Sequence, residues 1–121
     1  MMYIKGFRIC DEDSPSYSDM EYTVTDGTYE VECYSYGDPY AKIETFRLTA
    51  LYSENIMLSE EREPKVEKLP GYMSYRLTGV YSDGKIIVGD IAVWINGNVP
   101  GDISDGDCIT LECKRLDLFE R

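Results

Sequence analysis

Short runs of alternating apolar and polar residues recur along the chain, and turn-forming dipeptides separate them. Residues 28–36 place Tyr29, Val31 and Cys33 on one side of a strand, with threonine and glutamate residues on the other. Residues 107–116 repeat this pattern with isoleucine, leucine and cysteine on the apolar side. A period of two is typical of half-buried antiparallel strands. The alternation therefore predicts an all-β fold.

Seven segments read as strands once the turn signals are used as boundaries. They span residues 2–9, 20–25, 28–36, 40–52, 72–81, 85–95 and 107–116. Asp26-Gly27 and Asn96-Gly97 are the dipeptides that most favour a tight hairpin. The apolar run 85–95 is interrupted at Gly89, where the chain is expected either to stay buried on both faces or to change sheets.

The chain has the length of one ordinary domain, and we expect a single β domain over residues 1–121. Residues 11–19 are polar and turn-prone, which predicts an exposed acidic loop. Residues 53–70 have no clear period, so we expect an irregular connection with at most one short helix that ends at Pro64.

The C-terminal third carries a resemblance to a known fold. Residues 91–100 read IAVWINGNVP, and residues 102–113 read DISDGDCITLEC. This succession of strand, turn, Gly-Asp dipeptide and final strand resembles the closing section of an OB-fold. The resemblance implies a five-stranded Greek-key barrel with extensions. The strand spacing and the resemblance together predict a small antiparallel OB-like barrel of about six to eight strands. A β-sandwich is the alternative.

The charge balance limits the partners that the chain can bind. Aspartate and glutamate number 23 against 12 lysine and arginine residues, which gives a net charge of −11. Such a surface repels nucleic-acid phosphates and anionic membranes. The oligonucleotide binding associated with OB-folds is therefore not expected here. The charge favours a basic protein surface, a cationic ligand or a divalent metal, although acidity also simply keeps small proteins soluble.

Most routes to catalysis are closed by composition. The chain has no histidine, which excludes Ser–His–Asp and Cys–His arrangements. Its four cysteines form no C-x-x-C motif, so neither a zinc ribbon nor a redox pair is predicted. No cofactor is expected, and an enzyme is the less favoured class. With no membrane-length apolar run and no signal peptide in the sequence, we expect a cytoplasmic protein with reduced thiols.

Two weaker chemical signals involve carboxylates. The acids around residues 11–21 or 96–107 can gather a hard cation, but Pro100 takes a ligand position of the EF-hand spacing. Turn formation explains the second segment equally well. Asp90 interrupts an apolar strand, and we expect it either to pair with Arg76 or to turn outward at Gly89; acid–base catalysis is the less favoured reading.

Tyrosine is the unusual feature of the composition, with 11 residues, of which six lie between positions 17 and 40. Tyr34 and Tyr36 share a strand face opposite Cys33. Tyrosine is enriched at protein interfaces, although it also packs well half-buried on a sheet. The predicted partner-binding residues are Asp11, Glu12, Asp13, Tyr17, Tyr22, Tyr34, Tyr36 and Tyr40.

These residues lead to two expectations about function. The first is a non-enzymatic binding protein whose acidic, tyrosine-bearing surface docks on a basic face of a partner, as inhibitors, immunity proteins and nucleic-acid mimics do. The alternative is a small-ligand or carbohydrate-binding β-barrel with an aromatic-lined pocket.

Overall fold

The computed structural model describes residues 1–10, 17–38 and 42–120, and its strands form one open, mixed sheet. The eleven described strands are β1 (Tyr3–Ile9), β2 (Ser18–Thr25), β3 (Glu30–Gly37), β4 (Phe46–Leu51), β5 (Glu54–Leu58), β6 (Lys65–Lys68), β7 (Tyr75–Ser82), β8 (Lys85–Val88), β9 (Ile91–Ile95), β10 (Cys108–Cys113) and β11 (Arg115–Glu120). The prediction of an all-β fold is confirmed.

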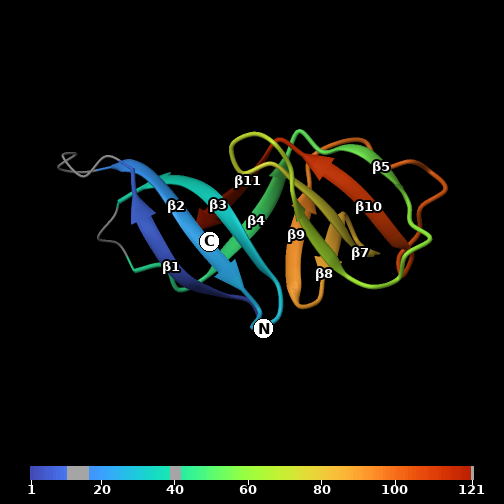
Figure 1. Cartoon of the computed structure of the whole chain (residues 1–121), viewed down its shortest axis with the longest axis horizontal. Helices are drawn as coiled ribbons and strands as arrows, with labels where there is room; N and C mark the ends of the chain where they lie inside the picture. The colour runs from blue at the N-terminus through green and yellow to red at the C-terminus, as the bar shows by residue number, and fades with distance from the viewer. Residues whose placement is uncertain (11–16, 39–41, 121) are drawn as a thin grey trace.

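The strands follow the order β1-β2-β3-β11-β4-β9-β8-β7-β10-β5, and β6 pairs with β7 beside this path. Two of the pairings, β3 with β11 and β4 with β9, are parallel. In Figure 1 the sheet coils along an elongated molecule, with β1–β3 at one end and β5, β7 and β10 at the other. The described strands thus form an open mixed sheet and not the closed antiparallel barrel that we expected.

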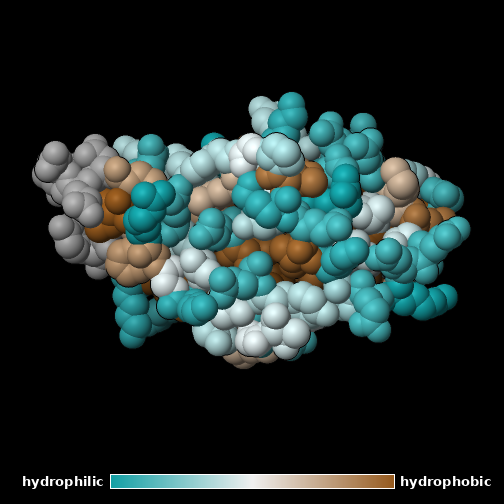
Figure 2. Space-filling model, viewed as in Figure 1, coloured by the Kyte–Doolittle hydropathy of each residue, from teal (hydrophilic) through white to brown (hydrophobic). Residues whose placement is uncertain are grey.

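Buried apolar side chains from both ends of the sheet form one core cluster. Val24 and Val31 of the first hairpin, Leu77 of β7 and Leu111 of β10 are almost fully buried. Figure 2 shows that hydrophilic side chains cover most of the face in view, while apolar surface appears in separate patches, the largest of them near the middle. Burial of the alternate apolar positions is the main force that holds such a sheet together.

Some of the turns predicted from local sequence are present in the structure, and others are not. Asp26-Gly27 forms the expected β2–β3 hairpin, in which Thr25 pairs with Glu30. Gly89 and Asp90 form a turn between β8 and β9, so the run 85–95 is two antiparallel strands.

Asn96-Gly97 does not make a hairpin, and this prediction is wrong. The Asn96 N–H donates to Ser53 Oγ at 3.1 Å, while the Ser53 N–H donates to the Asn96 carbonyl oxygen at 2.9 Å. A Cβ atom on Gly97 would lie 2.5 Å from the Ser53 carbonyl oxygen. The dipeptide therefore fits a close approach between two loops, which local sequence does not reveal.

Residues 53–70 contain β5 and β6 in place of the irregular connection that we expected. No helix forms within the described ranges. These residues therefore contain no helix that could cross a membrane.

Candidate functional site

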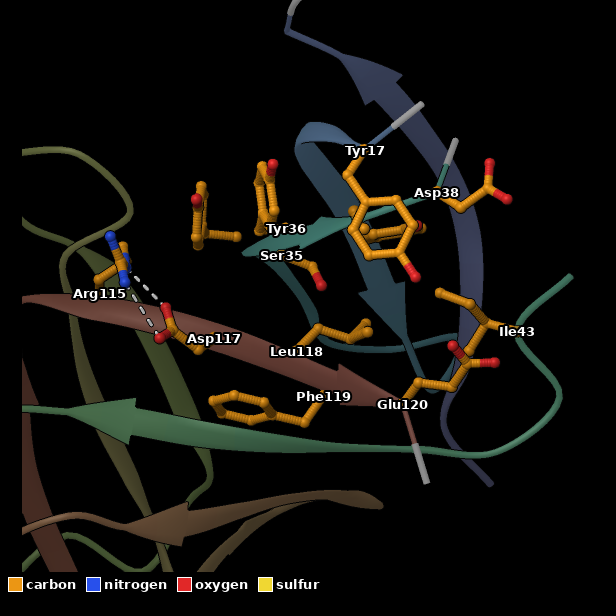
Figure 3. Close-up of a pocket in the computed structure, with 13 residues that line it drawn as sticks. Tyr17, Ser35, Tyr36, Asp38, Ile43, Arg115, Asp117, Leu118, Phe119 and Glu120 are labelled. Carbon is orange, nitrogen blue, oxygen red and sulfur yellow. Dashed lines mark hydrogen bonds and ion pairs between the residues drawn. The ribbon is translucent and has the colours of Figure 1, made fainter. Parts of the chain in front are cut away.

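A cavity of about 490 Å3 lies between β3 and β11, and we call it the tyrosine groove. Its described lining residues are Tyr17, Tyr22, Tyr34, Ser35, Tyr36, Gly37, Asp38, Ile43, Arg115, Asp117, Leu118, Phe119 and Glu120. Figure 3 shows Arg115 and Asp117 at one end of the groove, with Asp38, Ile43 and Glu120 around the other end.

The groove exists because two neighbouring strands separate. β3 and β11 pair in parallel at a single position, Asp117 opposite Tyr34. On its outer side, β3 stays paired with β2 up to Gly37, and β11 stays paired with β4 up to Glu120. Both strands are therefore held by their other neighbours while the space between them opens.

Two exposed aromatic rings lie in contact at the groove. Tyr17 and Tyr36 meet edge to face, with 5.9 Å between their ring centroids. Tyr17 is 58% exposed and Tyr36 is 62% exposed. Tyr17 directly precedes β2, whereas Tyr36 lies near the end of β3, and pairing of the two strands brings them together. Edge-to-face contacts of this kind favour defined ring positions.

An ion pair closes one end of the groove. Arg115 Nε donates to Asp117 Oδ1 at 2.6 Å, and Arg115 Nη2 donates to Oδ2 at 3.1 Å. This two-point contact with the nearly buried carboxylate raises the pKa of Arg115 above its ordinary value. The guanidinium also lies 4.2 Å from the centre of the Tyr34 ring, a cation–π distance. Arg115 is thus committed to partners within the molecule.

Tyrosine hydroxyls beside the groove donate to carboxylates. Tyr34 Oη donates to Asp19 Oδ1 at 2.7 Å, and this bond raises the pKa of Tyr34. The Tyr34 ring contacts the ring of Tyr72 edge to face at 6.5 Å between centroids. Tyr72 Oη in turn donates to Glu21 Oε2 at 2.6 Å. These bonds fix the side chains next to the groove in one arrangement.

The structure brings together part of the predicted partner-binding set. Tyr17, Tyr34 and Tyr36 all border the tyrosine groove. Tyr22 also lines it but is only 6% exposed, so its ring belongs to the wall and not to the outer surface. The remaining predicted residues, Asp11, Glu12, Asp13 and Tyr40, lie outside the described residues.

Sequence reasoning missed the half of the site that β11 contributes. Leu116 and Leu118 alternate with Asp117 and Phe119, and this short pattern was a usable strand signal. The pairing of β11 with β3 had no signal, because a parallel pair is joined by a long stretch of chain. Tyr72, which reaches Glu21 from a loop, was also missed.

The other chemical signals do not combine into a site. Within the described ranges, no three carboxylate or thiol groups gather closely enough to hold a metal ion. Arg76 pairs with Glu112 and Glu67, so the expected Arg76–Asp90 pair is wrong, and Asp90 turns outward at the β8–β9 turn.

The cysteines are free thiols. Cys33 and Cys113 are buried in the core, and burial raises the pKa of the Cys113 thiol to about 11 and that of Cys33 still further. Such thiols carry almost no reactive thiolate near neutral pH.

Comparison of the chain with protein-family models, with curated proteins and with solved structures found no match in any of the three. The functional argument therefore rests on the geometry of the described residues.

Proposed function

We propose that this protein is a non-enzymatic binding protein, which docks the tyrosine groove and its acidic border onto a basic face of a partner protein. The observation that carries the proposal is the contact of Tyr17 with Tyr36, two exposed rings beside a concave surface. Exposed tyrosines supply large contact area at low cost in conformational entropy, which is why protein interfaces are rich in them.

The charge of the groove supports a basic partner. Its described lining carries three carboxylates, from Asp38, Asp117 and Glu120, against the single guanidinium of Arg115. Asp117 neutralises Arg115, so Arg115 does not offset the other carboxylates of the described lining. The net charge of −11 adds a long-range field of the same sign. Such a field steers cationic surfaces toward the groove and weakens with added salt.

The proposal is tested by capturing basic proteins on the immobilised full-length protein. Immobilised wild type is compared with Tyr17→Ala/Tyr36→Ala and with Tyr3→Ala/Tyr52→Ala, which removes two exposed tyrosines outside the groove. We expect wild type and the control variant to retain the same basic proteins at about 50 mM NaCl. We expect both to lose them near 300 mM, where the Debye length falls below about 6 Å.

The Tyr17→Ala/Tyr36→Ala variant should lose these proteins at both salt concentrations. Retention by this variant equal to that of the control variant would contradict the proposal. Capture that does not respond to salt would contradict the electrostatic part of it.

A second candidate is the binding of a small ligand or a carbohydrate in the same groove. Its volume, about 490 Å3, falls in the range of ligand pockets, about 300–1,000 Å3. Tyr17, Tyr36 and Phe119 offer aromatic surface to such a ligand. Chemical-shift changes at Tyr36 and Phe119 on adding neutral saccharides, with no salt dependence, would favour this candidate over a basic protein partner.

A further inference from the structure

The tyrosine groove opens within the plane of the sheet and not on one of its faces. Four consecutive residues of each strand line it: Tyr34, Ser35, Tyr36 and Gly37 from β3, and Asp117, Leu118, Phe119 and Glu120 from β11. Because alternate residues of a strand point to opposite faces, a pocket on one face contacts every second residue. Contact with consecutive residues on both strands identifies a gap between the strands themselves, and Figure 3 shows β3 and β11 on its two sides.

The main chain of β3 directs hydrogen-bonding groups into this gap. The Glu32 N–H donates to Tyr75 Oη at 3.0 Å, so it points away from β2. The β2–β3 register runs without a bulge, so every second residue repeats this orientation. The N–H and C=O groups of Tyr34 and Tyr36 therefore also point away from β2. For Tyr36 this direction is the tyrosine groove.

The main chain of β11 faces the gap from the other side. The Leu116 N–H donates to the carbonyl oxygen of Met73 at 3.3 Å, so it points away from β4. Pairing of β11 with β4 continues residue by residue from Leu116 to Glu120. By the same alternation, the main-chain groups of Leu118 and Glu120 point away from β4 and toward β3. The Leu118 N–H belongs to the single bridge with Tyr34, so the Leu118 C=O and the Glu120 N–H are the groups that face the gap.

The described strands leave this pair of edges incomplete. A continued parallel ladder would pair Phe119 with Tyr36, but the register between β3 and β11 contains only Asp117 with Tyr34. Strand edges whose N–H and C=O groups lack a strand partner are templates on which a further strand can pair. Several peptide-binding domains recognise extended segments in this way.

We infer that an extended segment of the partner protein enters the tyrosine groove as an additional strand, paired with the inner edges of β3 and β11, and carries lysine or arginine side chains. This inference rests on the proposed function and specifies the form of the partner. Main-chain pairing supplies affinity. The cationic side chains of the segment meet the Tyr17 and Tyr36 rings and the carboxylate of Glu120.

A synthetic peptide of seven residues, alternating valine and lysine and blocked at both ends, serves as the probe. It is titrated into the isotope-labelled full-length protein, and amide exchange is followed by NMR. We expect binding to slow exchange at the Tyr36 and Glu120 amides at least tenfold. The same peptide N-methylated at every lysine keeps its charge and side chains but cannot pair along one edge. It should bind at least tenfold more weakly.

The outcomes separate this inference from the proposed function. Equal binding of the two peptides, with no protection at Tyr36, would overturn strand pairing but leave docking on a basic partner intact. If neither peptide binds, strand entry is wrong, and the proposed function is judged by the capture experiment alone.

A pair of substitutions tests the same inference from the side of the protein. Tyr36→Pro removes both the ring and the N–H that faces the groove, without removing an N–H that bonds to β2. Tyr36→Ala removes only the ring. We expect Tyr36→Pro to bind the unmethylated peptide at least fivefold more weakly than Tyr36→Ala. Equal affinities of the two variants, with the β2–β3 amides still protected, would contradict pairing at this edge.

Discussion

Glu21 accepts hydrogen bonds from two parts of the chain that are distant in sequence. Tyr72 donates to Oε2 at 2.6 Å, and Arg8 Nε donates to Oε1 at 2.8 Å. These bonds, that from Tyr72 foremost, hold the pKa of Glu21 below its ordinary value. We expect Tyr72→Phe to lower the free energy of unfolding at pH 7 by about 1 kcal/mol, the usual contribution of such a bond. Urea denaturation measures it.

The pH dependence of this effect has a definite sign. A carboxyl group with a lowered pKa in the folded state stabilises the fold above its ordinary pKa of 4.5, and this contribution is lost as the pH falls through the lower folded value. The difference between wild type and Tyr72→Phe should therefore be constant from pH 7 to about 5.5 and shrink below pH 4.5. Tyr3→Phe, at an exposed tyrosine, is the control and should show no difference. A difference that grows toward low pH would contradict the role assigned to Glu21.

At single residues, sequence predicts the face that a side chain occupies better than it predicts the partner. The alternation correctly placed Cys33 in the core and Tyr36 on the opposite face of the strand, but it did not show that Tyr36 is exposed. It did not predict that Tyr34 would lie under Arg115, because the two residues are 81 positions apart and meet only through the β3–β11 pairing. The aromatic half of the tyrosine groove was therefore within reach of the sequence, and the ion-paired half was not.

At the level of elements, the approach of β8 to β7 depends on a residue without a side chain. Gly79 lies in β7, opposite Ile109 of β10, and a Cβ atom there would be 2.3 Å from the carbonyl oxygen of Ile87. That distance is too short for a contact between nonbonded atoms, so a side chain at position 79 would force β8 to move away from β7. We expect Gly79→Ala to lower the free energy of unfolding by about 1–3 kcal/mol, the cost typical of overpacking.

Gly101→Ala is the matched control, because nothing lies within 4 Å of the position that its Cβ atom would take. This substitution should change the free energy of unfolding by less than about 0.5 kcal/mol. Thermal and urea denaturation of both variants make the comparison. If Gly79→Ala unfolds like Gly101→Ala, with Ile87 amide exchange unchanged, the β7–β8 contact is not as close as described.

The elements that sequence predicted best are those with local partners. The β2–β3 hairpin joins neighbouring segments, so its turn and its alternation point to the same answer. β5 and β11 were missed because they are short and pair with strands far away along the chain. β6 was missed because it is only four residues long, although it pairs with the next strand, β7. The open sheet has the same origin: the strand order, with β1 and β5 at its two ends, depends on long-range pairings such as β3–β11 and β4–β9, which no local pattern encodes.

At the scale of the whole molecule, repulsion among carboxylates opposes the folded state. The chain carries 11 more acidic than basic residues. Several of the described ion pairs, such as Lys5–Glu30 and Lys65–Glu61, lie between exposed side chains, where a pair contributes about 0–1 kcal/mol. Added salt weakens these pairs slightly but screens the larger excess of like charge. We therefore expect the melting temperature to rise as NaCl increases from about 10 to about 200 mM.

Neutralising two carboxylates that form no described ion pair separates the screening of charge repulsion from other effects of salt. Glu60 and Glu63 are exposed, and neither forms an ion pair with a described residue. Glu60→Gln/Glu63→Gln brings the net charge from −11 to −9 and should raise the melting temperature at low salt. Because less repulsion then remains to be screened, the rise on adding NaCl should be smaller than in wild type. A melting temperature that falls with NaCl, or an equal rise in both proteins, would show that specific ion pairs outweigh the net charge.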